Sequence, residues 1–249
     1  MMRRIVNQIL TALQFLTRLP LAPASYDAGS LASAAGWFPF VGLLIGAGAL
    51  AVHTLAARGL PPLLAALVTV VFLVVITGAL HEDGLADTAD GLGGGWTREQ
   101  ALRIMRDSRI GSYGAIALIL SLLARVLLLA SLRPAVFGRY LVAAHVLCRW
   151  STLPLSSFLR PAREQDGQGS RVAQQIPRSA FLLGSLFTAV AVGVLLGSRW
   201  WLPASAALLV TALSGFYFQR RLGGITGDCF GAANNLAEIA VYLCGVWQP

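Results

Sequence analysis

The sequence predicts an all-α fold, a bundle of about seven transmembrane helices with further amphipathic helices at the membrane surface. Of its 249 residues, 56% are hydrophobic and 12% are charged, and the mean hydropathy is +0.69. An average soluble domain carries about 25% charged residues. Several apolar stretches also approach the roughly 20 residues that a helix needs to cross a bilayer. Short polar connections separate them, so we predict a single integral-membrane domain over residues 1–249.

The net charge of +8 comes from arginine alone, because the 19 basic residues include no lysine. A basic balance can indicate nucleic-acid binding, but these arginines are scattered among apolar stretches and do not gather on one soluble face. We therefore expect a lipid bilayer around the protein and no nucleic-acid partner.

The three cysteines form no CxxC pair; they are Cys148, Cys229 and Cys244. The sequence therefore indicates neither a zinc site nor a disulfide framework.

The first segment combines Arg3 and Arg4 with apolar residues at helical spacing. A signal peptide that ends in the small residues 22–24 is one interpretation. Gln8 and Gln14, however, interrupt the apolar core that such a peptide requires. We therefore predict an amphipathic helix that lies at the membrane surface.

Seven apolar stretches follow, each near the length of one bilayer crossing. They are residues 37–57, 61–80, 113–132, 136–157, 180–198, 200–219 and 229–247. Positive residues near span ends accumulate on the cytoplasmic side. With the N-terminus inside, 13 arginines lie on that side, three lie inside spans, and Arg58, Arg133 and Arg199 lie outside. This predicts a multi-pass protein of the cell inner membrane whose active site faces the cytoplasm.

A run of aspartates follows the second span. If its helix continues, Asp83, Asp87 and Asp90 are spaced i, i+4 and i+7 and share one face. Like charges at this spacing repel, and hard oxygen ligands suit magnesium or manganese. A solvated acidic helix end is the alternative, but six of the eleven acidic residues lie between Glu82 and Asp107. Glu82 points off the shared face, so we do not count it as a ligand.

Two polar segments on the predicted cytoplasmic side, residues 81–112 and 158–179, are long enough to build a site. In the first, the glycines between 91 and 95 are expected to end the helix. Thr97 and Gln100 then form a capping-box pattern that starts a new helix. The second segment is either a solvated connection or a lid over a substrate.

Arg106 and Arg109 flank a glycine-containing turn before the third span. A guanidinium group binds phosphate through two hydrogen bonds, and a helix N-terminus offers free N–H groups. We therefore predict a phosphate site here.

The last span carries Asp228, Asn234, Asn235 and Glu238, too many polar residues to face lipid. Ionisable groups at membrane depth indicate function by default, and polar packing between helices is the alternative. For the same reason Arg149 should face a carboxylate, a phosphate or a water-filled cavity. We expect Arg125 and Arg139 to extend toward the membrane surface.

Six segments, in order along the chain, resemble the cobalamin synthase family, adenosylcobinamide-GDP ribazoletransferase. They are Phe15-Leu16-Thr17-Arg18-Leu19-Pro20, Gly36-Trp37-Phe38-Pro39, His81 through Gly91, Arg106 through Gly114, Arg149-Trp150 and Gly227 through Glu238. The third is the most specific. It departs from the family pattern at Glu82, where an apolar residue is more usual.

The resemblance implies a Mg²⁺-dependent reaction at adenosylcobinamide-GDP. The 3′-hydroxyl of α-ribazole, or of its 5′-phosphate, would attack the phosphate attached to cobinamide, and GMP would leave. The implied metal ligands are Asp83, Asp87, Asp90 and Asp228; Arg106, Arg109, Arg149, Asn234 and Asn235 would bind substrate; Asp107 or Glu238 would act as general base. The resemblance leaves open whether the chain forms a homo-oligomer or associates with other corrinoid-pathway enzymes.

Two other kinds of membrane protein use aspartates in a similar way. CDP-alcohol phosphotransferases carry an Asp-Gly-x-x-Ala-Arg element, whereas Asp83-Gly84 is followed here by Leu85-Ala86-Asp87. A transporter with an acidic cation site would predict inverted repeats, and the sequence contains no convincing internal repeat.

Overall fold

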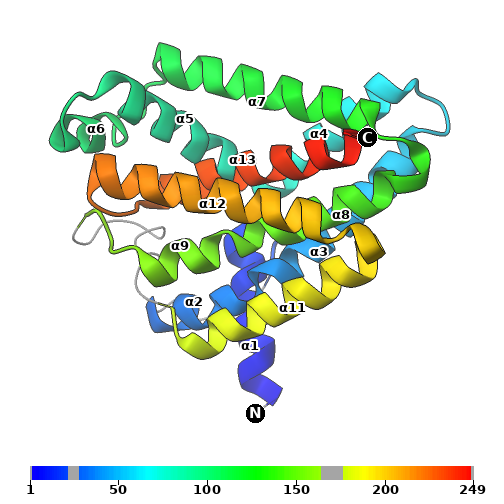
Figure 1. Ribbon diagram of the computed structural model, residues 1–249, viewed down its shortest axis with the longest axis horizontal. Coiled ribbons are helices and arrows are strands. Elements are labelled where there is room, and N and C mark those ends of the chain that lie inside the picture. Colours follow the sequence, from blue (N-terminus) through cyan, green and yellow to red (C-terminus); the bar gives the residue numbers. More distant parts are fainter. Residues whose placement is uncertain (1, 22–27, 164–175, 248–249) are drawn as a thin grey trace.

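A computed structural model describes residues 2–21, 28–163 and 176–247, and within these ranges the fold is a bundle of helices (Figure 1). The elements are α1 (Met2–Leu16), α2 (Ala28–Ala34), η1 (Ala35–Trp37), α3 (Phe38–Ala56), α4 (Pro62–Thr77), α5 (Leu80–Gly94), α6 (Arg98–Ile104), α7 (Ser112–Ser131), α8 (Pro134–Trp150), α9 (Thr152–Phe158), α11 (Arg178–Leu196), η2 (Gly197–Arg199), α12 (Trp201–Leu222) and α13 (Gly227–Val246). The described residues contain no β-strand, so the predicted all-α class is confirmed.

Five helical segments of the described chain are long and apolar enough to cross a membrane. They are Leu31–Ala56, Ser112–Ser131, Arg178–Arg199, Trp201–Leu222 and Gly227–Val246. The bent pair α4 and α5 gives a sixth crossing if it counts as one span. These segments match five of the seven predicted spans and part of a sixth. The predicted span 136–157 is divided between α8 and α9, and α8 has 17 residues.

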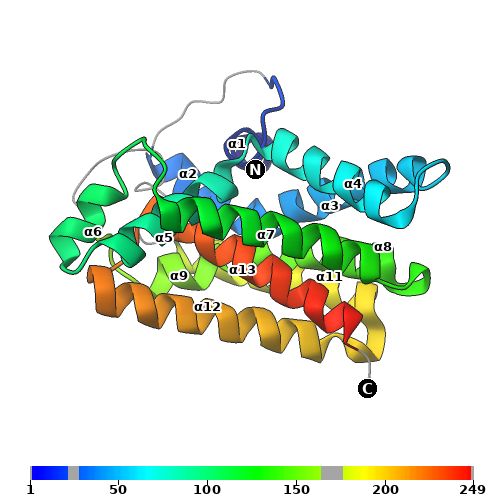
Figure 2. The same cartoon turned by 90° about the horizontal axis from the view of Figure 1, so that it is seen from above.

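Helices α8 and α13 form the centre of the bundle. Every residue of α8 from Tyr140 to Arg149 is buried. α13 packs against α5, α7, α8 and α12, and two perpendicular views place it between α7 and α12 (Figures 1 and 2). The polar residues of these two helices therefore meet inside the protein and do not face lipid.

The aspartate segment does not continue the helix before it. Gly78 and Ala79 both adopt left-handed backbone conformations, with φ of 63° and 57°, and α5 turns by 88° from α4. Left-handed φ angles cannot continue a right-handed helix, so the expected continuation of the second span is wrong. Asp83, Asp87 and Asp90 nevertheless keep their helical spacing, because all three lie on α5.

The glycines after this segment end the helix as expected. α5 runs through Gly91 and Gly93 and ends at Gly94. A side chain on Gly91 would lie 2.9 Å from the Ala101 carbonyl oxygen, and one on Gly93 would lie 2.6 Å from the Tyr113 ring. The glycines therefore let neighbouring elements approach α5. The predicted capping box at the start of α6 is confirmed.

The first segment forms the predicted helix, α1, whose C-terminal end is fixed to the rest of the bundle. The Arg18 N–H donates to the Ile76 carbonyl at 2.8 Å, and the indole of Trp37 donates to the Gln8 side chain at 3.3 Å. The small residues 22–24 and most of the segment 158–179 lie outside the described residues.

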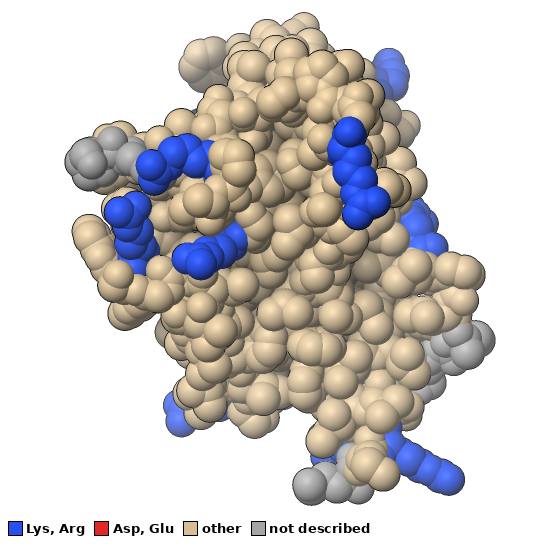
Figure 3. Space-filling model, turned by 90° about the vertical axis from the view of Figure 1, so that its right-hand side faces the viewer, with Lys and Arg blue, Asp and Glu red and all other residues tan. Residues whose placement is uncertain are grey.

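Charge is unevenly distributed along the bundle. The described acidic residues belong to α5, α6, α13 and the α6–α7 connection. On the end that carries the α3–α4, α7–α8 and α11–α12 turns, the visible charged side chains are arginines, with no acidic side chain (Figure 3). The acidic chemistry is therefore confined to the rest of the molecule.

Candidate active site

The site forms where α5 crosses α13 with almost no side chain between the two backbones. A side chain on Gly84 would lie 2.6 Å from the Asp228 carbonyl oxygen, and one on Gly231 would lie 2.9 Å from the His81 carbonyl oxygen. Small residues permit such close approach between membrane helices. The crossing brings Asp83 next to Asp228, although 144 positions separate them in the sequence.

Three carboxylates act on one another electrostatically at this crossing. Burial and the negative charges of Asp83, Asp228 and Asp90 all disfavour the ionised form of Asp87. Arg163 offsets part of this unfavourable energy, for Asp87 and for Asp228. Hard carboxylate oxygens in excess of the surrounding positive charge form the donor set that Mg²⁺ or Mn²⁺ favours. Asp83, Asp87 and Asp228 could therefore attract a divalent metal. Among the described residues, however, only His145, Cys148 and Glu238 place three metal-type ligand atoms within 4.8 Å of one another, so the aspartate side chains would have to move closer together to bind one ion.

Arg163 also belongs to the site, although no pattern in the sequence predicted a role for it there. One guanidinium nitrogen donates to the Leu102 carbonyl at 2.7 Å. The backbone N–H of the preceding residue, Ala162, donates to the Ile225 carbonyl at 2.8 Å, which holds this segment against the start of α13. The Nε atom of Arg163 is buried and has no hydrogen-bond partner among the described residues. This donor could bind a phosphate oxygen. A loop arginine far along the chain carries no spacing signal that would have revealed this.

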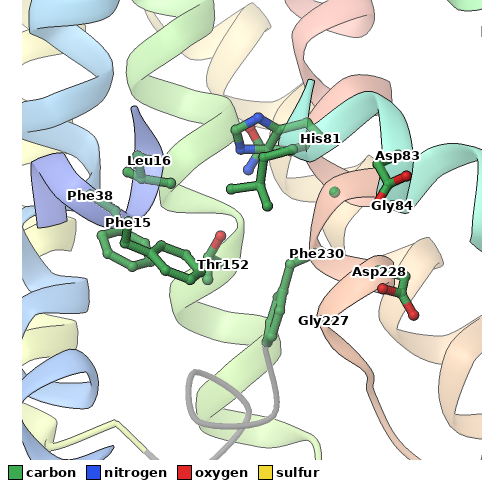
Figure 4. Close-up of a pocket in the computed structure, with 13 residues that line it drawn as sticks. Phe15, Leu16, Phe38, His81, Asp83, Gly84, Thr152, Gly227, Asp228 and Phe230 are labelled. Carbon is green, nitrogen blue, oxygen red and sulfur yellow. The ribbon is translucent and has the colours of Figure 1, made fainter. Parts of the chain in front are cut away.

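A cavity of about 160 Å³ opens beside the carboxylates (Figure 4). Asp83 and Asp228 lie at one end of it, and Phe15 and Phe38 lie at the other. Phe230 stands between the two ends. The cavity therefore connects an acidic surface to an aromatic surface.

Asp90 has a different role from the one its spacing suggested. Its carboxylate oxygens accept hydrogen bonds from the N–H groups of Gly111 at 2.7 Å and Gly114 at 2.8 Å. These groups belong to the first turn of α7, where a negative charge is stabilising. Asp90 thus joins α5 to α7. It also occupies two of the N–H groups that we expected to be free for phosphate, so that part of the predicted phosphate site is wrong.

Asp107 and Arg109 form an ion pair at the surface, with a distance of 2.7 Å between the Asp107 carboxylate and the Arg109 guanidinium. The hydrogen bonds from Arg109 lower the pKa of Asp107 to about 2. A carboxylate with such a low pKa is a weak base. The geometry therefore gives little support to Asp107 as the general base. Arg106 lies close enough to act electrostatically on Arg163.

A second group of charged residues lies deeper between the same helices. Arg125 is 2% exposed and pairs with Glu82 and, at 2.9 Å, with Glu238. The expectation that Arg125 extends toward the membrane surface is therefore wrong.

Arg149 donates to His145 Nδ1 at 2.7 Å. It therefore faces a histidine and not the carboxylate, phosphate or water-filled cavity that we expected.

Glu238, which was predicted as a possible general base, takes part in this interior packing. Glu238 is ion-paired, which does not favour a role as general base. His145, Cys148 and Glu238 place metal-type ligand atoms within 4.8 Å of one another, but Arg125 and Arg149 already bind Glu238, His145 and Cys148. This group is therefore satisfied without a metal.

The two asparagines of α13 point to different neighbours. Asn234 donates to the Cys148 carbonyl on α8 at 2.7 Å and also lines the cavity. Asn235 accepts a hydrogen bond from Ser121 on α7 at 3.4 Å. The structure thus brings Asn234 to the cavity, whereas Asn235 packs between helices.

The fold and site define an integral-membrane protein with a candidate cation and phosphate centre. The chain belongs to the cobalamin-5-phosphate synthase family, whose model matches residues 8–246. The motif resemblance is confirmed, and the chain is a transferase of this family.

Relatives named adenosylcobinamide-GDP ribazoletransferase align over nearly the whole chain. The protein from Shewanella frigidimarina is 41% identical, covering 96% of this chain and 94% of the relative. The one from Ralstonia pickettii is 40% identical, with 93% and 91% covered, and the one from Rhizobium etli is 42% identical, with 94% of each covered. No solved structure matches the chain.

Proposed function

We propose that this protein joins adenosylcobinamide-GDP to α-ribazole or α-ribazole 5′-phosphate, with Mg²⁺ at the α5–α13 crossing. The observation that carries this proposal is that Asp83 and Asp228 line one cavity, with Asp87 and Arg163 close enough to act on Asp228 electrostatically. The family and the names of the relatives supply the substrates. Neither rival class, a CDP-alcohol phosphotransferase or a transporter, is favoured by any of these findings.

The reaction breaks the phosphoanhydride bond of the diphosphate and forms a phosphate ester bond to ribazole. The 3′-oxygen of ribazole forms a bond to the phosphorus next to cobinamide and loses its proton. The bond from that phosphorus to the bridging oxygen breaks, and GMP leaves with this oxygen. Phosphoryl transfer depends on positioning and on charge neutralisation more than on covalent chemistry. A divalent metal would supply that neutralisation at the diphosphate.

The residues of the chain have separate tasks in this scheme. Asp83, Asp87 and Asp228 would hold the metal. Arg163 directs its unpaired Nε donor to a phosphate oxygen, because charge-assisted hydrogen bonds to guanidinium are strong. Asp90 fixes the first turn of α7 beside α5 and does not coordinate the metal.

The test is a reconstituted reaction. Purified protein in detergent or liposomes is incubated with adenosylcobinamide-GDP, α-ribazole 5′-phosphate and Mg²⁺, and GMP is measured. We expect GMP release that stops when the metal is chelated and resumes when Mg²⁺ is added back. Folded protein that releases no GMP would refute the proposed activity. Undiminished release in the presence of chelator would refute the metal.

We also propose that the site faces the cytoplasm from the inner membrane. The arginine distribution supports this orientation. A cysteine introduced at the exposed Glu99, on α6 close to the site, tests it in a variant with the three native cysteines replaced. A membrane-impermeant thiol reagent should label this cysteine in inverted vesicles and not in intact spheroplasts. The opposite labelling pattern would reverse the orientation.

A further inference from the structure

The cavity beside the aspartates has an end that phosphoryl transfer does not explain. Asp83 and Asp228 account for one end of it. The other end is formed by Phe15, Leu16 and Phe38, three apolar side chains from α1 and α3. Two of the segments singled out in the sequence, 15–20 and 36–39, thus converge here without a part in the chemistry described above.

The aromatic end has a defined geometry. The rings of Phe15 and Phe38 stack with centroids 5.5 Å apart and an angle of 8° between their planes. Phe38 is 1% exposed, and Phe15 is partly buried. Phe230, from the first turn of α13, faces this pair across the cavity (Figure 4). Rings on both sides of a cavity suit a flat aromatic ligand.

This end is built into the fold. Arg18, two residues after Leu16, donates its backbone N–H to Ile76 at the end of α4, and its side chain packs against Gly78, where any side chain would clash with it. The end of α1 is therefore held against the corner from which α5 departs. This contact fixes the distance between the aromatic end and the aspartates.

The middle of the cavity carries polar side chains beside Phe230. His81 from α5, Thr152 from α9 and Asn234 from α13 line it, and all three are buried. Buried polar side chains in an otherwise apolar cavity orient a bound ligand through hydrogen bonds. The order along the cavity is thus aromatic, polar and acidic.

We propose that this cavity is the binding site of the acceptor nucleoside. The benzimidazole ring of α-ribazole lies between Phe15 and Phe230, its ribose lies beside Thr152 and His81, and its 3′-hydroxyl points to the aspartates. The inference rests on the proposed function for the identity of the ligand. Along the cavity, the aromatic, polar and acidic surfaces follow one another in the same order as the base, the ribose and the reacting hydroxyl of α-ribazole.

The other two parts of the substrates fit this cavity poorly. The corrin ring of cobinamide is far larger than a 160 Å³ space. Guanine carries hydrogen-bond donors and acceptors around its edge, and burial without partners disfavours such groups. The residues at the aromatic end offer apolar side chains, which suit the methyl-substituted edge of dimethylbenzimidazole.

Steady-state kinetics with the two substrates varied separately test the assignment. Phe15→Leu and Phe230→Leu each keep an apolar side chain but remove one ring. We expect the KM for α-ribazole to rise roughly tenfold in each, the size expected when a base loses one stacking partner. The KM for adenosylcobinamide-GDP and the Mg²⁺ dependence should stay unchanged. Phe187→Leu is the matched control, because Phe187 pairs with Phe40 away from this cavity.

A binding measurement separates this inference from the proposed reaction. Equilibrium dialysis of α-ribazole against the full-length protein, with chelator and without corrinoid, reports binding whether or not the enzyme turns over. Weaker binding by the two variants, with Phe187→Leu unchanged, supports the cavity even if no GMP is ever released. Active variants whose KM and binding match the wild type would overturn the assignment and leave the proposed reaction standing. Failure of the wild type to bind α-ribazole would also overturn it.

Discussion

Two acidic regions of this protein are made from the same two helices and differ in charge balance. α5 contributes Asp83 to the candidate metal site and the adjacent Glu82 to the buried ion pairs. α13 contributes Asp228 to the first region and Glu238 to the second. On α5 the two acids are neighbours, so the direction in which each projects decides which region it joins. On α13 ten positions separate them, so the distance along the helix decides.

The charge balance distinguishes a region that stabilises the fold from one that can bind a ligand. In the buried region, the carboxylates of Glu82 and Glu238 are matched by Arg125 and Arg149 in the same polar cluster. At the site, by contrast, Asp83, Asp87 and Asp228 repel one another, and Arg163 offsets only part of this repulsion. The paired charges of the buried region need no bound ion, whereas the excess negative charge at the candidate metal site favours a bound cation.

The largest expected effect is on stability, from Arg125→Met. This change leaves two buried carboxylates without their cation, which costs about 3–5 kcal/mol when one partner of a buried pair is removed. The thermal unfolding midpoint in detergent should fall sharply, while the Mg²⁺ dependence of any folded enzyme stays the same. Arg139→Met, at an exposed position of α8, is the control. Adding Glu82→Gln and Glu238→Gln to Arg125→Met should restore most of the loss; no recovery would mean that charge is not the cause.

Asp87→Asn should have the opposite pattern, with a large effect on turnover and none on folding. Loss of a metal ligand should lower kcat by about 10²–10³-fold, since the charge stabilisation by a catalytic metal is worth several kcal/mol and each 1.4 kcal/mol is a factor of ten. GMP release at saturating substrate is the measurement. Glu99→Gln, an exposed acid on α6, should keep full activity. Wild-type turnover by Asp87→Asn would remove this residue from the metal site.

Gly84→Ala should damage both regions together, because both depend on the α5–α13 crossing. The added carbon would lie 2.6 Å from the Asp228 carbonyl oxygen, and overpacking of this kind costs about 1–3 kcal/mol. Unfolding midpoint and GMP release should both decrease. Gly193→Ala, where an added side chain meets nothing within 4 Å, is the matched control. Equal behaviour of the two variants would argue against close contact at the crossing.

The smallest effect is expected from Asp90→Asn. Removal of a negative charge from the first turn of α7 should cost about 1–2 kcal/mol. The half-saturating Mg²⁺ concentration should not change, because Asp90 binds Gly111 and Gly114. Titration of GMP release with Mg²⁺ measures this directly. A higher half-saturating Mg²⁺ concentration would mean that Asp90 is a metal ligand after all.

Much of the site could be predicted from the sequence, because its acids are dense and regularly spaced. Asp83 and Asp87 are one helical turn apart on α5, and both reach the acidic cluster. Asp228 was assigned through the family resemblance and lies beside them. Arg163 and Phe15 could not be placed in this way, because no local period links a loop arginine or the end of α1 to residues on α5.

The sequence by itself determined the membrane class, most of the spans, the capped start of α6 and the family. These properties depend on composition, on the length of the apolar stretches and on local hydrogen bonding, and residues close together in the sequence determine all three. The tertiary structure alone decided how each acid is used. Asp90 binds a helix terminus, Glu82 and Glu238 bind Arg125, and Asp83 and Asp228 face a cavity. Identical carboxylates acquire different roles because a charge in a low-dielectric interior is governed by its partners, and helix packing chooses those partners.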